Sequence, residues 1–472
     1  MYNPKSLKAE EFIDHDEIME SIKYADENKS NVKVIDEILK KARESKGLDH
    51  REASVLLACD IPEKNEEIYK LANEIKLEYY GNRIVLFAPL YLSNYCINGC
   101  TYCPYHAKNR TIPRIKLTQD QIRDEVIALQ DMGHKRLALE TGEDPIHNPI
   151  EYVLESIDTI YSIKHRNGAI RRVNVNIAAT TVENYQKLHE AGIGTYILFQ
   201  ETYHKESYKE LHPTGPKSDY AYHTEAMDRA MQGGIDDVGL GVLFGLDKFR
   251  YEFAGILMHA EHLEAVHGVG PHTISVPRIC PADDIDVGDF SNAIDDETFA
   301  KIVACIRIAV PYTGMIVSTR ESQKVRERVL HLGISQISGG SRTSVGGYTE
   351  EERPEDTTQF EVSDRRTLDE VIKWLMEMDY VPSFCTACYR EGRTGDRFMA
   401  LCKAKQIQNC CLPNALMTLE EYLVDYAAPE TRALGEKIIA DNFKDINNPK
   451  VLEIMKGRLE LIKNGGERDF RF

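Results

Sequence analysis

The sequence of 472 residues contains no apolar run that approaches the roughly 20 residues of a transmembrane helix. Its first residues, Met1 to Lys8, lack the apolar core of a signal peptide, so we expect none. Basic residues are too few to balance the acidic ones: 58 Lys and Arg stand against 76 Asp and Glu, a net charge of -18. This deficit argues against nucleic acid and against a membrane surface as partners.

The eleven cysteines do not fit a disulfide framework, because their number is odd and most of them fall in two clusters. Without a signal peptide, such clusters favour metal binding in a reducing cytoplasm. We therefore expect a cytoplasmic protein whose thiols need low oxygen to stay intact. Cys59 stands apart from the clusters after an apolar run, and we expect it to be a packed core thiol.

The spacing of apolar residues predicts three regions. Residues 1–82 have helical spacing and form a predicted N-terminal extension, with a capping box at Asp49 and Glu52. Residues 83–347 alternate apolar strands with amphipathic helices, which predicts an α/β fold of the (β/α)8 TIM-barrel type; a doubly wound open sheet is the alternative. Residues 348–472 form a predicted C-terminal domain that opens with a linker, 348–365. The eight predicted strands are 83–93, 136–141, 173–178, 195–199, 238–244, 273–276, 315–318 and 334–337.

The predicted helix borders support this strand count. Three capping boxes and three C′ glycines recur in one strand–cap–helix–glycine layout. The boxes are Thr118 with Gln121, Thr180 with Glu183, and Ser318 with Glu321, and the glycines are Gly133, Gly192 and Gly333.

The first cysteine cluster, Cys96-Ile-Asn-Gly-Cys100-Thr-Tyr-Cys103, follows the first predicted strand. Gly99 lets the backbone turn so that three thiolates converge. Three thiolates on a four-iron cluster leave one iron open, and an open iron can chelate S-adenosylmethionine (SAM). A zinc site or packed core thiols are the alternatives, although no fourth Cys or His lies at a usual zinc spacing nearby. The motif resembles the radical-SAM superfamily, with Tyr102 as the aromatic residue before the third cysteine.

Other predicted strand ends carry elements that resemble the SAM-binding elements of this superfamily. Thr141-Gly142-Glu143 is similar to its Gly-Gly-Glu motif, and the glycine-rich fifth strand is similar to its adenine-binding motif, except that Lys248 replaces the final Glu. Turns and charged loops are the plain alternatives. The predicted cofactor-binding residues are Tyr102, Thr141, Gly142, Glu143, Gln200, Glu201, Gly241, Leu243 and Arg278.

The seventh and eighth strand ends predict a carboxylate clamp. Arg320 can bind a carboxylate through two parallel hydrogen bonds, and it stands at a helix start that also attracts anions. Ser338 and Ser341 lie in a Gly/Ser loop, 338–347, that can assist Arg320. A salt bridge of Arg320 with Glu321, or simple flexibility of the loop, is the alternative.

The second cysteine cluster contains Cys385-Thr-Ala-Cys388, followed 22 residues later by Cys411. Cys410 competes with Cys411 as third ligand, since adjacent cysteines seldom both reach one cluster. Three ligands again suggest an iron–sulfur cluster with an open iron, and structural zinc is the alternative.

The pairing of CxxxCxxC with CxxC-x22-C resembles the HydG family, the radical-SAM tyrosine lyases that mature [FeFe]-hydrogenase. The resemblance implies a [4Fe-4S] cluster with SAM at one barrel mouth, a second [4Fe-4S] cluster with an additional iron at the other end, and a channel between them. The family uses a histidine for the additional iron. Of His259, His262, His267 and His272, we predict His262, near the helix end on the side of the second cluster.

The resemblance also implies the activity. L-Tyrosine is cleaved to p-cresol and dehydroglycine, and the latter becomes CO and cyanide bound to iron for hydrogenase assembly. Implied partners are an electron donor such as ferredoxin or flavodoxin and the other hydrogenase maturases. One alternative is the 2-iminoacetate synthase of thiazole (thiamine) synthesis, which leaves the second cluster unexplained. Another is a non-catalytic iron–sulfur scaffold, which leaves the barrel-mouth elements unexplained.

Overall fold

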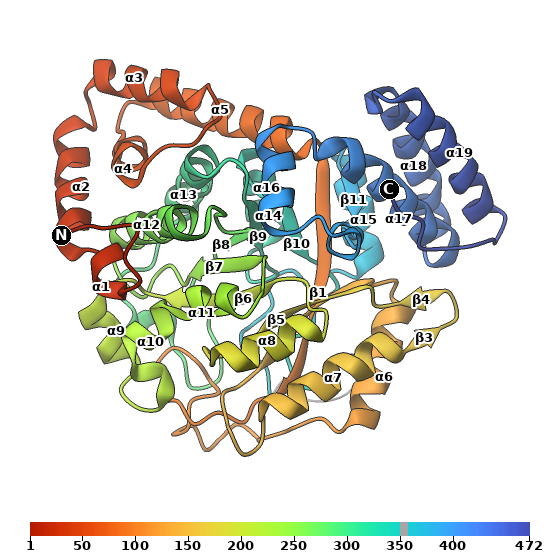
Figure 1. Ribbon diagram of the computed structural model, residues 1–472, viewed down its shortest axis with the longest axis horizontal. Helices are drawn as coiled ribbons and strands as arrows, with labels where there is room; N and C mark the ends of the chain where they lie inside the picture. Colours follow the sequence, from red (N-terminus) through yellow and green to blue (C-terminus); the bar gives the residue numbers. More distant parts are fainter. Residues whose placement is uncertain (350–356) are drawn as a thin grey trace.

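The computed structural model describes residues 1–349 and 357–472. Eight parallel strands pair in chain order, and the last pairs back to the first, so that the sheet closes into a barrel (Figure 1). The predicted barrel is confirmed and the open sheet is excluded. The strands are β1 (Arg83–Ser93), β2 (Arg136–Thr141), β5 (Arg172–Asn176), β6 (Tyr196–Glu201), β7 (Val238–Val242), β8 (Thr273–Ser275), β9 (Gly314–Val317) and β10 (Gln336–Ser338).

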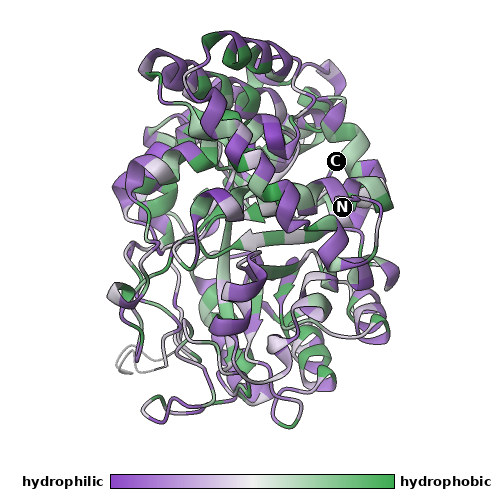
Figure 2. Cartoon of the chain, turned by 90° about the vertical axis from the view of Figure 1, so that its left-hand side faces the viewer, coloured by the Kyte–Doolittle hydropathy of each residue, from purple (hydrophilic) through white to green (hydrophobic). Residues whose placement is uncertain are grey.

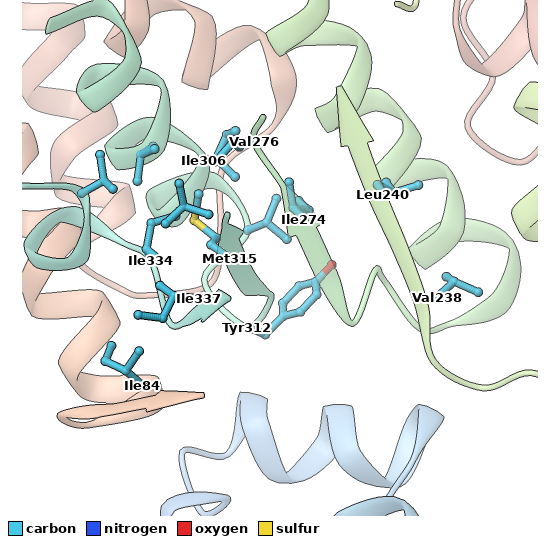
Figure 3. Packing of buried hydrophobic residues seen from close by; sticks show 14 of the residues in the cluster. Ile84, Val238, Leu240, Ile274, Val276, Ile306, Tyr312, Met315, Ile334 and Ile337 are labelled. Atoms are coloured by element: carbon cyan, nitrogen blue, oxygen red, sulfur yellow. The ribbon is translucent and has the colours of Figure 1, made fainter. Parts of the chain in front are cut away.

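Helices surround the barrel because the outward face of each strand is apolar. Ile84, Leu240, Ile274 and Met315 are at most 1% exposed and pack against the helix layer (Figure 3). The surrounding helices are α6 (Gln119–Asp131), α7 (Ile150–Ser162), α8 (Val182–Glu190), α9 (Lys205–Leu211), α10 (Tyr220–Thr224), α11 (Ala226–Gln232), α12 (Phe249–His267), α13 (Asp296–Ala309), α14 (Gln323–Leu332) and α15 (Leu368–Glu377). The outward-facing parts of these helices carry many hydrophilic residues, which are purple in Figure 2.

The chain before and after the barrel covers one of its ends. The N-terminal helices contact α12, α13 and α14, and most of the C-terminal helices lie to the right of the start of β1 in Figure 1. The N-terminal helices are α1 (Ala9–Phe12), α2 (His15–Asn28), α3 (Val32–Ala42), α4 (His50–Ala58) and α5 (Pro62–Tyr80), and the C-terminal helices are α16 (Gly395–Lys403), α17 (Gln408–Asp425), α18 (Pro429–Asp441) and α19 (Pro449–Lys463). No described helix is both long enough and apolar enough to span a membrane.

The helix borders agree with the sequence in part. The capping boxes at Asp49 and Thr118 are confirmed. The other two were predicted at the wrong residue: Thr181 caps α8, and Ser322 caps α14 after a turn that follows β9. In both places a second hydroxyl residue close by competes for the same role.

The C′ glycines also agree in part. Gly133 and Gly192 adopt positive φ, 94° and 74°, as a C′ glycine does. Gly333 has an extended φ of 176° instead. Its missing side chain matters for space, because a Cβ there would lie 2.9 Å from Cβ of Arg307.

A short strand that the sequence did not reveal connects the C-terminal region to the barrel. Strand β11 (Val381–Ser383) pairs in parallel with the first residues of β1, from Arg83 to Val85. Its three residues are too few to show a period. This pairing brings Cys385 and Cys388 close to Arg83, the first residue of β1, with which they line one cavity. A second short pair, β3 (Lys164–His165) with β4 (Gly168–Ala169), forms a hairpin on the outside.

The described part of the predicted linker lies against the mouth of the barrel. Residues 350–356 of the prediction lie outside the described residues. Tyr105 donates a hydrogen bond to the carbonyl of Thr357 at 2.9 Å. Asp364, with 2% of its side chain exposed, pairs with the buried Arg326. Segment 357–365 thus contains no helix or strand but packs against the barrel, and its buried Asp364 forms an ion pair that polar composition alone did not indicate.

Candidate active site and metal centres

The first three cysteines line one cavity at the mouth of the barrel. Their loop follows β1 and is fixed by backbone hydrogen bonds, from Ile97 to Glu143 and from Gly99 to Thr214, both at 2.9 Å. Cys96, Cys100 and Cys103 all face the cavity, which measures about 1080 Å³ counted out to its open mouth. Burial raises the pKa of Cys100 to about 12 and also raises that of Cys103.

Three thiols with no carboxylate in the same loop suit an iron–sulfur cluster that keeps one iron open. Among the described residues, no three His, Cys, Asp or Glu side chains are gathered closely enough to hold a single metal ion. The predicted role of Gly99 changes: a Cβ there would lie 2.3 Å from Oγ1 of Thr214, so close packing requires the glycine.

The end of β2 packs directly against this cysteine loop. Asn98 donates a hydrogen bond to Glu143 at 2.6 Å. A Cβ on Gly142 would lie 2.4 Å from the carbonyl oxygen of Tyr95 and 3.1 Å from Cβ of Cys96. Thr141, Gly142 and Glu143 all line the cavity, as the sequence predicted.

An ion pair also lies in the wall of this cavity. Lys217 Nζ is 2.8 Å from Oε1 of Glu201, and both side chains are largely buried. Burial alone would lower the pKa of Lys217, but Glu201 and Cys100 outweigh it and raise that pKa. Glu201 also has a φ of 69°, a strained value outside glycine. Gln200 points elsewhere and donates to Oγ1 of Thr224 at 2.9 Å.

Of the remaining predicted cofactor-binding residues, two line the mouth cavity and two do not. Tyr102 and Leu243 line the cavity, and the Tyr102 hydroxyl lies 2.8 Å from Nε2 of His212. Gly241 does not line the cavity. A Cβ there would lie 2.3 Å from the ring of Phe199, so this glycine makes room for that ring, and Phe199 itself lines the cavity. Arg278 also lies outside, since its guanidinium is bound by Glu321 and Asp296.

A deeper cavity continues from the first into the barrel. The two share six lining residues, Tyr91, Glu140, Asn176, Phe199, Arg320 and Gln359. Arg320 stacks its guanidinium 3.6 Å above the ring of Phe360. Ser338 lines the deeper cavity with Arg320, whereas Ser341 faces a separate hollow beside Arg342. The structure thus brings together two of the three predicted substrate residues.

Sequence reasoning missed Tyr91, Glu140, Asn176 and Lys217. The first three could have been found from the period of two along a strand, since residues 136, 138 and 140 of β2 face the same side. Lys217 lies in the loop after α9, which carries no motif.

The second trio of cysteines lines a smaller cavity at the start of β1. Cys385, Cys388 and Cys411 share its wall with Arg83, and no His, Asp or Glu belongs to that wall among the described residues. A hydrogen bond between Cys388 and Cys411 raises the pKa of Cys388 and lowers that of Cys411. Cys410 does not reach the cavity. A set of three thiols again suits an iron–sulfur cluster.

The last residues of the described chain close this second cavity. Phe470 and Arg471 belong to its wall. Asp469 pairs with Arg390 at 2.7 Å, and Arg390 lies two residues after Cys388. The backbone N–H of Phe472 donates to Oδ1 of Asn414, another residue of the cavity wall, at 2.9 Å.

The structure contradicts the prediction that His262 binds the additional iron. Its ring is fully buried and stacks on Phe12, with centroids 3.7 Å apart. Nδ1 lies 2.8 Å from the carbonyl of Pro4 and Nε2 lies 3.0 Å from Asp228, so neither nitrogen is available to a metal. Helical spacing alone did not show that the N-terminal segment covers this face.

His272 occupies a different position, at the end of the barrel where the second cavity lies. It directly precedes β8, on the side where each strand begins. Its Nδ1 has no hydrogen-bond partner among the described residues, and its nearest carboxylate, on Asp237, is 3.4 Å away. Burial lowers the pKa of His272 to about 4, so its imidazole is neutral at pH 7. A neutral imidazole is the form that binds metals.

Two family models match the sequence. Residues 90–260 match the radical SAM superfamily, and residues 275–381 match the Biotin and Thiamin Synthesis associated domain. The first match contains the mouth cysteines and the second contains Arg320 and Ser338.

Individual proteins resemble the chain to different extents. It is 30% identical to 2-iminoacetate synthase of Salmonella typhimurium over 318 residues, 67% of this chain and 81% of that protein. A crystal structure of HydG, a maturase of the [FeFe]-hydrogenase, is 55% identical with a TM-score of 0.94 and covers 98% of this chain and 100% of its own. HydG from Carboxydothermus hydrogenoformans is 38% identical with a TM-score of 0.81, over 96% and 99%. The likeness to the two HydG structures thus extends over almost all of the chain, whereas that to the synthase leaves a third unmatched.

Proposed function

Because the chain belongs to the HydG family of radical SAM proteins, we propose that it cleaves L-tyrosine to p-cresol and dehydroglycine and converts the latter to CO and cyanide on iron, for [FeFe]-hydrogenase assembly. The observation that carries the proposal is the presence of two cysteine trios, each lining its own cavity, at opposite ends of one barrel. Supporting it, the HydG structures resemble the chain along nearly its whole length.

The mouth cavity suits a [4Fe-4S] cluster with SAM. Cys96, Cys100 and Cys103 would hold the cluster, which supplies reductive cleavage of SAM when bound. Glu143 and the Lys217–Glu201 pair add polar groups to the wall for SAM.

The deeper cavity suits an aromatic amino acid. Arg320 can bind the substrate carboxylate, and Ser338 lies in the same wall. Phe87, Pro89 and Ile316 provide an apolar surface for the ring. Gln359 and Phe360 of segment 357–365 form part of the wall of this cavity, which would help to keep water from a reactive intermediate.

The second cavity would hold a [4Fe-4S] cluster on Cys385, Cys388 and Cys411, with an additional iron as the acceptor of CO and cyanide. His272 is our replacement for His262 as a protein ligand to that iron, because it is buried, neutral and lies at this barrel end. Ferredoxin or flavodoxin as electron donor, and the other hydrogenase maturases as recipients, complete the proposal.

A second candidate is the activity named for the Salmonella relative, 2-iminoacetate synthase. It would use the mouth cavity in the same way, and the Biotin and Thiamin Synthesis associated match favours it. It gives no role to the second cysteine trio.

The test is an anaerobic assay of the reconstituted full chain with SAM, a reductant and L-tyrosine. We expect p-cresol and 5′-deoxyadenosine in equal amounts, followed by CO and cyanide. Cys385→Ala with Cys388→Ala should keep p-cresol and lose CO, while Cys59→Ala, far from both cavities, should change neither. Wild-type protein that makes p-cresol without CO would favour the synthase, and protein that makes neither would favour an iron–sulfur scaffold.

A further inference from the structure

Glu140 is a half-buried residue whose carboxyl group lies at the junction of the two connected cavities. It stands on β2 with its side chain turned into the barrel, between Tyr91 of β1 and Asn176 of β5, its partners in the sheet register. It lines both the mouth cavity and the deeper cavity. No motif assigned it a role.

Arg320 faces the same space from the loop after β9, and its charge acts on Glu140. Among the residues that the structure describes, neither side chain takes part in an ion pair within 4.0 Å. A carboxyl group and a guanidinium group thus face one shared space without pairing with each other. A ligand with one anionic and one cationic end would satisfy both at once. An α-amino acid is such a ligand.

Resting on the proposed function, we propose that Glu140 binds the α-amino group of the substrate amino acid and accepts one proton from it, while Arg320 holds the α-carboxylate. In this step one N–H bond of the ammonium breaks, its electron pair stays on nitrogen, and an O–H bond forms on Glu140. Nothing is oxidised or reduced. The amine is then neutral.

The surroundings of Glu140 favour this transfer. Burial raises the pKa of Glu140 well above its usual value, and the nearby Arg320 and Asn176 only partly oppose that rise. In a cavity of low dielectric constant, a neutral amine beside a neutral carboxyl is preferred to two charges. Tyr91 and Tyr105 also face Glu140, and burial raises the pKa of both, so that they stay neutral. Arg320 is therefore the charged group that acts on it.

The position of Glu140 also directs the amine. It immediately precedes Thr141, Gly142 and Glu143, which line the mouth cavity against the cysteine loop. An amine bound by Glu140 is therefore held on the side of the cavity that faces the three mouth cysteines. Arg320 holds the carboxylate on the other side, so the pair fixes the orientation of the substrate.

The first test is a binding comparison with the reconstituted full chain. L-Tyrosine is compared with 3-(4-hydroxyphenyl)propanoate, which lacks only the amino group, by calorimetry under anaerobic conditions. We expect wild-type protein to prefer tyrosine at least tenfold, Glu140→Gln to lose that preference, and Glu140→Asp to regain part of it. The matched control is Glu420→Gln, which changes a buried carboxyl group that has no hydrogen-bond partner among the described residues, on α17 and outside both connected cavities. An unchanged preference in Glu140→Gln would overturn the proposal.

The second test separates binding from proton transfer. In Glu140→Gln the buffer must remove the proton, so kcat/KM for p-cresol formation should rise about tenfold per pH unit from pH 7 to 8.5, more steeply than in wild-type protein. Equal profiles would overturn the proton transfer. If wild-type protein formed no p-cresol at all, the proposed function would fail, but the binding comparison would still decide whether Glu140 recognises an amino group.

Discussion

The ammonium group of Lys217 lies 2.8 Å from the carboxylate of Glu201, in the wall of the cavity that the mouth cysteines line. Lys217→Met leaves Glu201 buried and unpaired, which should lower the free energy of unfolding by about 3 kcal/mol. The double variant Lys217→Met with Glu201→Gln should lose less than the sum of the two single variants. Urea denaturation of all four proteins measures the coupling, and additive losses would show that the pair is not energetically coupled.

Gly142 leaves no room for a side chain beside the first cysteine loop. Gly142→Ala places a methyl group 2.4 Å from the carbonyl of Tyr95, so the loop that carries Cys96 must shift. We expect the variant to fold but to bind about four fewer iron atoms after reconstitution, the content of one four-iron cluster. Gly457→Ala on α19, where a Cβ meets nothing within 4 Å, is the control and should keep all its iron. Full iron content in Gly142→Ala would contradict the tight packing described for this loop.

Cys411 and Cys410 are adjacent but only Cys411 reaches the second cavity. Cys411→Ser should therefore abolish the second cluster signal in low-temperature EPR and leave the mouth cluster intact. Cys410→Ser should retain both signals. The reverse outcome would make Cys410 the third ligand.

His259 on α12 makes the stability depend on pH. Burial, helped by the nearby His262, lowers the pKa of His259 from 6.5 to about 3. As the pH falls below 6.5 the unfolded chain takes up a proton that the folded chain excludes, so stability falls between pH 6.5 and about 3. This one group contributes at most about 1.4 kcal/mol per pH unit.

The measurement is the free energy of unfolding against pH for wild-type protein and His259→Gln. The variant should show the shallower slope in this range. His189→Gln, at an exposed position near the end of α8, should keep the wild-type slope. Parallel curves for wild-type protein and His259→Gln would mean that His259 does not exclude the proton.

The barrel could be predicted because its strands are long apolar runs between helices with clear caps; β1 and β2 were predicted to the residue. The mouth trio of cysteines was predictable from spacing, whereas for the second trio the spacing left Cys410 and Cys411 open as the third member. Contacts between distant segments were not. Nothing near His262 in the sequence shows that Phe12 and the carbonyl of Pro4 cover it.

The same limit explains the other differences. Asp364 looks like a solvent-exposed linker residue until Arg326, 38 positions earlier, is seen beside it. Gly241 fits an adenine-binding motif, yet the ring of Phe199 on the neighbouring strand occupies the space that its missing side chain leaves. Glu140 was given no role because a single carboxyl on a strand carries no pattern.

Strand β1 begins at Arg83, in the wall of the second cavity, and ends at Ser93, three residues before Cys96. Its 11 residues extend for roughly 35 Å. At that separation, oxygen can oxidise the cysteine thiols at one end of β1 and leave those at the other end intact. A preparation exposed to oxygen would then contain molecules with only one intact site. A molecule that had lost only the second site could still carry out the reaction at the first, and would be mistaken for an enzyme that lacks the second site.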